Sequence, residues 1–92
     1  MSIVYLDGAY LPMAEARISP MDRGFLFGDG IYEVLPSYDG KIVGFSLHMQ
    51  RMLNGLRFID IALDWSQHQW RTVCNTLIDK NGGGNLGLYL HV

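Results

Sequence analysis

The chain has 92 residues, of which 49% are apolar and 17% are charged, a balance typical of a globular domain rather than a disordered segment. This length suffices for one domain and is too short for two, so we expect residues 1–92 to form a single domain. The seven basic and nine acidic residues are scattered with no basic run, so neither nucleic acid nor a membrane surface is an expected partner.

A β-hairpin is predicted at the start of the chain. The short apolar runs Ile3–Leu6 and Ala9–Leu11 flank the pair Asp7-Gly8. Aspartate and glycine tolerate the positive φ angles of a tight primed turn, which is the turn that joins adjacent antiparallel strands. Residues 18–30, which follow, show no regular pattern and contain three glycines.

A second hairpin is predicted by the same logic. The pair Asp39-Gly40 separates the run Ile31–Tyr38 from the run Lys41–Gly44. Pro36 lies inside the first run, and proline has no N–H to donate to a neighbouring strand. We therefore expect this strand to be bulged at Pro36 or to lie at the edge of its sheet.

A first helix is predicted over Ser46–Asp60, with Ser46 as its N-cap. On one flank of this helix lie His48, Arg51 and Gly55, each about one turn from the next. The glycine on this flank would let another group approach the helix closely. The side chains expected to face the core recur at helical spacing: Met49, Met52, Leu53, Leu56 and Ile59.

A second helix is predicted over Ser66–Asn81. Ser66 and Gln69 match a capping box, and Trp65 and Trp70 are placed to form a hydrophobic staple across the first turn. Lys80 lies in the last turn, where a positive charge is favoured. The side chains expected to be buried are Trp70, Val73, Cys74, Leu77 and Ile78.

The last segment, Leu86–Val92, alternates with the period of a β-strand. The run Gly82-Gly83-Gly84 follows a helix and precedes this strand, so it is interpreted as a helix stop and linker rather than a phosphate-binding loop. Because a natural domain seldom ends on an apolar strand residue, we expect the chain to be a piece of a longer protein. The elements together predict an α+β fold, a two-layer sandwich of a mostly antiparallel sheet with both helices on one face.

Metal sites and nucleophilic triads are not expected. His48, His68 and His91 have no ligand spacing on one element, and no serine lies in a G-x-S-x-G elbow. The only cysteine, Cys74, falls in a core stripe and cannot form an internal disulfide, which fits a reducing compartment such as the cytoplasm. Met1–Val4 has no positive region or long apolar core, so no signal peptide is expected, and no stretch is long enough to span a bilayer.

Arg51 has two interpretations. An arginine on a helix flank is most often simply solvated. The alternative is a bound anion, because the planar guanidinium fork matches the oxygens of a phosphate or carboxylate. The helix pattern by itself leaves both interpretations open.

The most specific stretch of the sequence is Asp22–Val34, D-R-G-F-L-F-G-D-G-I-Y-E-V. Its charged and aromatic residues interleave with glycines, which by itself predicts a tight turn leading into a strand. On that strand Tyr32 and Val34 share a face with Tyr38, and Glu33 lies on the other face.

This stretch resembles the amino-terminal signature of class IV aminotransferases, which are pyridoxal-phosphate enzymes of fold type IV. Within that family it is most similar to the D-amino-acid aminotransferases. The similarity continues through the hairpin Tyr38–Lys41, the helix pattern His48–Met52 (H-x-x-R-M for the family's H-x-x-R-L) and the strand Leu88–Val92. It covers essentially the whole chain and implies that residues 1–92 are the small amino-terminal domain of such an enzyme.

The resemblance implies roles for the matching positions. Arg51 would bind the phosphate of pyridoxal phosphate, and His48 would support Arg51. Tyr32 would hold the carboxylate or side chain of the substrate, Val34 would line the substrate pocket, and Tyr89 would lie near the site. The family acts on amino acids and 2-oxo acids as a homodimer, with its active site between the small domain and a larger carboxy-terminal domain.

The chain departs from the family pattern at the catalytic lysine. The chemistry needs a lysine whose amine condenses with the cofactor aldehyde, and the family's lysine lies beyond residue 92. Neither Lys41 nor Lys80 matches its position. We therefore expect no catalytic residue within residues 1–92, expect the larger lysine-bearing domain to be absent from them, and predict that this piece alone is inactive.

Two alternatives stay open at the level of the sequence. One is a different enzyme of the same fold, either an aminodeoxychorismate lyase or a branched-chain aminotransferase, although the run Ile31–Val34 favours the D-amino-acid group. The other is a stand-alone domain without enzymatic activity, which would self-associate through an exposed strand edge and uncovered apolar faces.

Overall fold

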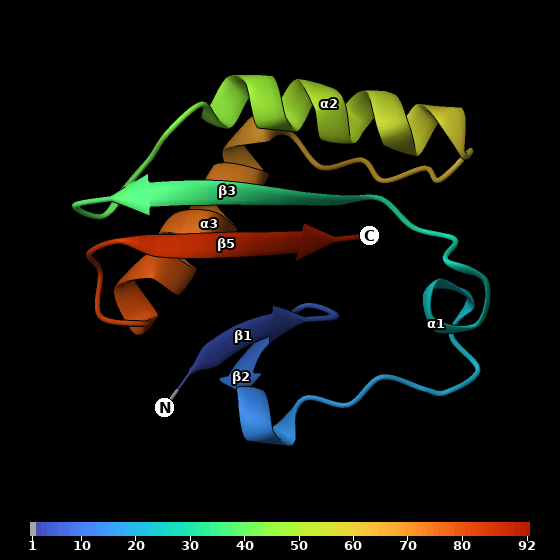
Figure 1. Cartoon of the computed structure of the whole chain (residues 1–92), viewed down its shortest axis with the longest axis horizontal. Helices are drawn as coiled ribbons and strands as arrows, with labels where there is room; N and C mark the ends of the chain where they lie inside the picture. Colours follow the sequence, from blue (N-terminus) through green and yellow to red (C-terminus); the bar gives the residue numbers. More distant parts are fainter. Residues whose placement is uncertain (1) are drawn as a thin grey trace.

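The computed structural model describes residues 2–92. Met1, which belongs to the segment in which no signal peptide is expected, lies outside the described residues. No helix within residues 2–92 is long and apolar enough to cross a membrane. Figure 1 shows the helices and strands. In chain order they are β1 (Ile3–Leu6), β2 (Ala9–Pro12), the 3₁₀ turn η1 (Met13–Glu15), α1 (Arg23–Phe27), β3 (Tyr32–Tyr38), β4 (Lys41–Ile42), α2 (Phe45–Phe58), α3 (Gln67–Lys80) and β5 (Leu86–His91).

Both predicted hairpins are present. Asp7 and Gly8 turn the chain between β1 and β2 with φ angles of 48° and 90°. Asp39 and Gly40 turn it between β3 and β4 with φ angles of 52° and 76°. These positive angles are the reason that aspartate and glycine occupy both turns.

β3 is the central strand of a three-stranded antiparallel sheet with the order β4-β3-β5, and its register with β5 continues unbroken through Pro36. The prediction of an edge strand or a bulge at Pro36 is therefore wrong. The Pro36 carbonyl accepts a hydrogen bond from the Val43 N–H, on the side of β4. In an antiparallel strand the N–H and C=O of one residue point to the same side. The N–H that proline lacks would thus point away from β5, and the ladder to β5 loses no bond.

The two long helices cover one face of this sheet, with α3 behind β3 and β5 in Figure 1 and α2 running along β3. Residues at alternate positions of β3 and β5 meet them, and the buried core comprises Leu35, Phe45, Met49, Met52, Leu56, Cys74, Ile78, Leu88 and Leu90. The predicted α+β sandwich with both helices on one face is therefore confirmed. Its strands form two sheets, because the β1–β2 hairpin pairs with no other strand in the described part of the chain.

The start of α2 differs from the prediction. The helix begins at Phe45, and its N-cap is Gly44, whose φ of 70° turns the chain out of β4. Ser46 is therefore not the cap. Leu53 was also expected in the core but is 39% exposed. Met52 faces the centre of the core, and its neighbour in sequence points about 100° away around the helix.

The start of α3 follows the prediction. The Ser66 hydroxyl accepts a hydrogen bond from the Gln69 N–H at 3.2 Å, and the Gln69 side chain accepts one from the Ser66 N–H at 2.7 Å. The rings of Trp65 and Trp70 lie 4.8 Å apart, as a staple requires. Cys74 lies on the buried face of this helix, and burial raises the pKa of its thiol to about 11.

We predict that S66A lowers the free energy of unfolding by about 1 kcal/mol, because the Gln69 N–H in the first turn loses the hydroxyl that accepts its hydrogen bond. S46A is the matched control. Ser46 caps nothing in α2, so this variant should differ from the wild type by less than about 0.5 kcal/mol. Urea denaturation followed by circular dichroism measures both, and equal losses in the two variants would contradict the assignment of the caps.

The residues at the end of α3 form hydrogen bonds with β1 and with the β3–β4 turn. The Asn81 side chain accepts a hydrogen bond from the Ile3 N–H and donates one to the Ile3 carbonyl, both at 2.9 Å, which ties β1 to α3. The three glycines Gly82, Gly83 and Gly84 all have positive φ angles. They form the predicted linker, and the Gly84 carbonyl accepts a hydrogen bond from Gly40 in the β3–β4 turn.

Residues 18–30 are less irregular than expected, because they contain the short helix α1. Asp22 caps it by accepting a hydrogen bond from the Gly24 N–H at 2.8 Å, and Gly28 ends it with a φ of 68°. The apolar periodicity that identifies a helix needs more than five residues, so the pattern could not reveal it.

Candidate functional site

Glu33 is the centre of a compact polar cluster. It lies on the face of β3 that is turned toward the helices, and only 6% of it is exposed. Its two carboxylate oxygens accept hydrogen bonds from Arg51 Nε and Nη2, both at 2.8 Å. One of them also lies 2.7 Å from Nδ1 of His48. Both partners come from the flank of α2 that the sequence singled out.

Arg51 and His48 compensate the buried negative charge of Glu33. Because a carboxylate can only accept, the Nδ1 of His48 carries the hydrogen of that bond. The hydrogen bond from Arg51 holds the pKa of Glu33 below its usual value, burial opposes this shift, and His48 reinforces it. The ion pair in turn raises the pKa of Arg51. Glu33 is thus a carboxylate at neutral pH, and Arg51 is cationic.

We predict that Glu33 makes stability sensitive to acid. The pKa of Glu33 is lower in the folded chain than its ordinary 4.5, so its contribution is complete above about pH 4.5 and is lost as the pH falls through the folded-state value. The stability difference between wild type and E33Q should therefore be constant near neutral pH and shrink below pH 4.5. The limiting slope is about 1.4 kcal/mol per pH unit. Urea denaturation at a series of pH values measures it, and a difference that grows on acidification would contradict the assignment.

Arg51 keeps donors available outside this cluster. Its side chain is 71% exposed although its guanidinium is anchored. A guanidinium has five N–H donors, and the contacts to Glu33 use one on Nε and one on Nη2. The donors on Nη1 and the second one on Nη2 can bind an anion from solution. The geometry therefore fits an oxyanion such as a phosphate monoester.

A second candidate surface lies on the opposite face of the same strands. Tyr32, Val34 and Tyr89 are all predicted site residues, and all three point away from the helices. Val34 pairs with Tyr89 across the ladder, and the Tyr32 and Tyr89 rings stack with centroids 5.8 Å apart. Tyr32 and Tyr89 are more than 60% exposed. Together they form an aromatic wall with two hydroxyl groups.

His91 joins this wall, which the sequence did not predict. It pairs with Tyr32 across the ladder, and its Nδ1 lies 3.0 Å from the Tyr89 hydroxyl. A side chain at Gly30 would collide with the His91 imidazole, because its Cβ would overlap Nε2 of that ring. Gly30 of the Asp22–Val34 motif therefore makes room for His91.

Glu33 stands between Tyr32 and Val34 in sequence and connects the two surfaces. Successive side chains of a strand alternate between its two faces. Glu33 therefore holds Arg51 at one face of β3, and Tyr32 and Val34 present the aromatic wall on the opposite face. Along the edge of β3 that faces β4, the ladder includes only Ser37 and Tyr38, so the preceding part of this edge has no strand paired to it. A ligand that reached from Arg51 to Tyr32 would pass this unpaired part of the strand.

The predicted close approach at Gly55 is also present, and the group that approaches is Ile31. A Cβ at Gly55 would lie 3.0 Å from two atoms of the Ile31 side chain, which is closer than ordinary packing allows. Ile31 immediately precedes the start of β3. The contact sets the distance between α2 and the part of β3 from which Glu33 reaches Arg51.

No role was assigned to Glu33 from the sequence, although a signal was present. Glu33 shares its strand face with Leu35 and Ser37, and a carboxylate on a buried face needs a cationic partner. His48 and Arg51, three residues apart on one helix flank, were the available partners. The missing information was which strand α2 would contact.

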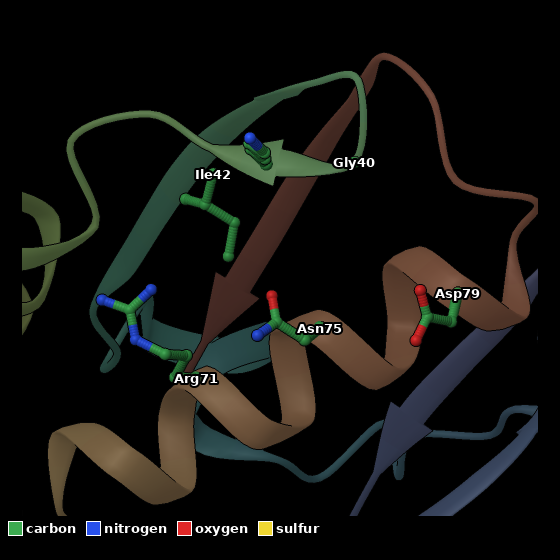
Figure 2. Close-up of a pocket in the computed structure, with 6 residues that line it drawn as sticks. Gly40, Ile42, Arg71, Asn75 and Asp79 are labelled. Carbon is green, nitrogen blue, oxygen red and sulfur yellow. The ribbon is translucent and has the colours of Figure 1, made fainter.

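A separate cleft of about 480 Å³ lies between the β3–β4 turn and α3, and Figure 2 shows it. Arg71, Asn75 and Asp79 line it from successive turns of α3, and Ile42 faces them from β4. Lys41 lines the same cleft, whereas the Lys80 ammonium lies 5.5 Å from the ring centre of Tyr10. No residue of the Glu33 cluster or of the aromatic wall lines this cleft.

Comparison with known proteins gives a consistent picture. The family model for amino-transferase class IV matches residues 30–92. The chain is 33% identical over 90 residues to a D-alanine aminotransferase of Staphylococcus haemolyticus, covering 98% of this chain and 32% of that enzyme. A D-alanine aminotransferase of Bacillus licheniformis is 33% identical over 89 residues, covering 97% of this chain and 31% of that enzyme. The chain thus spans about a third of the length of these relatives.

The fold has a counterpart among solved structures. A branched-chain aminotransferase from Thermoproteus uzoniensis, crystallised with norvaline, superimposes with a TM-score of 0.87 at 19% sequence identity. The match covers 98% of this chain and 32% of that one. The family match contains Arg51, its anchor Glu33, and the wall residues Tyr32, Val34 and Tyr89. The chain belongs to the amino-transferase class IV family.

Proposed function

We propose that residues 1–92 are the small amino-terminal domain of a pyridoxal-phosphate transaminase that moves an amino group between a D-amino acid and a 2-oxo acid. The observation that carries this proposal is Arg51, a cation anchored at Glu33 with exposed donors beside it. Because the chain spans about a third of its relatives, we propose that a larger domain with the catalytic lysine completes the enzyme.

The proposed roles follow the geometry of the two surfaces. Arg51 binds the cofactor phosphate through the donors that Glu33 leaves available. Val34 and the rings of Tyr32 and Tyr89 form an apolar wall of the substrate pocket, and the tyrosine hydroxyls can donate to a substrate carboxylate. Pyridoxal phosphate, when bound, supplies the carbonyl that takes up the amino group and a ring that stabilises the resulting charge.

The substrate class rests on the relatives. Those of Staphylococcus and Bacillus are D-alanine aminotransferases, and at about 33% identity they support a D-amino acid. A homodimer is proposed as well, because the resemblance to class IV aminotransferases implies one. A cytoplasmic location is in keeping with the single cysteine, which is buried and unpaired.

The test uses the intact gene product with pyridoxal phosphate. Incubation with D-alanine and 2-oxoglutarate should yield pyruvate, measured by a coupled dehydrogenase, and residues 1–92 alone should yield none. Absence of activity with every D-amino acid would overturn the substrate assignment. Activity with branched-chain L-amino acids would indicate a branched-chain aminotransferase. Release of pyruvate from aminodeoxychorismate without an amino acceptor would indicate a lyase.

A further inference from the structure

We propose that Glu33 is a positioning residue that holds the Arg51 guanidinium in the orientation in which it binds phosphate. The inference rests on the proposed function, in which Arg51 contacts the cofactor. Glu33 itself touches no ligand in this proposal, because its carboxylate is buried and both of its oxygens are engaged by Arg51 and His48.

The need for an anchor follows from the exposure of Arg51. An arginine side chain that is 71% exposed samples many rotamers unless something holds its end, and a ligand that binds it must then restrict them. Glu33 binds Nε and Nη2 through two parallel hydrogen bonds of 2.8 Å. This two-point contact fixes the plane of the guanidinium as well as its position.

Glu33 is a rigid anchor because the fold fixes it from three sides. It lies on the central strand of the sheet, where Leu90 is its partner in β5. The contact of Ile31 with Gly55 holds the start of that strand against α2. His48, about one turn before Arg51 on the same helix, donates to the carboxylate at 2.7 Å and prevents it from rotating.

A purely electrostatic role for Glu33 makes the opposite prediction. The carboxylate neutralises part of the Arg51 charge, so removing it should strengthen the attraction of Arg51 for a phosphate if charge alone matters. If orientation matters more, removing it should weaken phosphate binding. In E33Q the amide NH₂ would face donors of Arg51 or His48, so the two-point contact would not be kept. The direction of the change therefore separates the two roles.

The affinity test uses the intact gene product and pyridoxamine 5′-phosphate, which carries the phosphate but has no aldehyde to react with a lysine. We expect E33Q to raise its Kd by roughly 3- to 10-fold, the range for a side chain that must be immobilised on binding. E33D, which keeps the charge but is one methylene shorter, should also raise the Kd. E15Q removes the same charge from an exposed position and should leave the Kd within about twofold of the wild type. Tighter binding by E33Q, or unchanged binding by both Glu33 variants, would overturn the proposal.

A double variant shows whether Glu33 acts through Arg51. With R51Q already present, E33Q should cause no further loss, and an undiminished additional loss would overturn the positioning role. If R51Q alone leaves the Kd unchanged, the proposed role of Arg51 in binding phosphate fails, and the orientation measurement that follows still decides whether Glu33 positions Arg51.

The orientation itself can be measured by NMR on residues 1–92 without any ligand. The Arg51 Nε–H should exchange slowly with water and show restricted motion, and both properties should be lost in E33Q. Arg57, exposed on the same helix, is the internal control. Because this measurement needs only the wild type, a variant that fails to fold does not prevent the test. An Arg51 side chain as mobile as that of Arg57 in the wild type would contradict the proposal directly.

Discussion

R51Q in the intact gene product should weaken the binding of pyridoxal phosphate by about 10- to 100-fold, which corresponds to the loss of charge-assisted hydrogen bonds worth about 1.5–3 kcal/mol. The reason is that Arg51 offers anchored donors to a phosphate dianion, whereas an amide offers weaker donors and no charge. Equilibrium dialysis measures the dissociation constant. Pyridoxal without its phosphate should bind the wild type and R51Q equally.

The matched control for this prediction is R57Q. Arg57 is exposed in the last turn of the same helix, so its replacement removes an equal charge without touching the Glu33 cluster. Its Kd for pyridoxal phosphate should stay within about twofold of the wild type, as for a distant charge screened by solvent. If R51Q and R57Q lose affinity equally, or if R51Q loses equal affinity for pyridoxal, Arg51 does not contact the phosphate.

L35A should lower the free energy of unfolding of residues 1–92 by about 2–5 kcal/mol. Leu35 is fully buried on the central strand, where it packs between the sheet and both helices, and truncation would leave a cavity there. The total stability of a small domain is only about 5–15 kcal/mol, so this variant should be largely unfolded at moderate urea. Urea denaturation followed by tryptophan fluorescence is the measurement.

L47A provides the comparison for this prediction. Leu47 lies on α2 but is 78% exposed, so it should change stability by less than about 0.5 kcal/mol. A loss of similar size in both variants would mean that the core does not lie between β3 and the helices. A loss for L35A below about 1 kcal/mol would mean that its site collapses without a cavity.

Local signals in the sequence were sufficient for the hairpins and for the second helix. Asp7-Gly8 and Asp39-Gly40 specify their turns through backbone angles alone, and the Ser66 capping box uses only neighbouring residues. Alternation placed Tyr32 and Val34 on one face of their strand, and the pairing of Val34 with Tyr89 in the structure adds Tyr89 to that face.

What the sequence could not supply depends on contacts between distant segments. Glu33 and Arg51 are eighteen residues apart, and their pairing requires that α2 packs on β3 in one particular register. His91 belongs to the wall because β5 pairs beside β3 and because Gly30 makes room for it. Gly44 replaced Ser46 as the cap for a similar reason, since the path from β4 into α2 decides where the helix can begin.

The most direct test of the central claim is a single half-reaction of the intact gene product. The protein is loaded with pyridoxal phosphate and given D-alanine without any 2-oxo acid, and the cofactor and product are quantified by chromatography. We predict that pyruvate and pyridoxamine phosphate form in equal amounts, one per active site, whereas L-alanine gives neither. Unchanged pyridoxal phosphate after incubation with D-alanine and with other D-amino acids would contradict the claim that this chain belongs to a D-amino-acid transaminase.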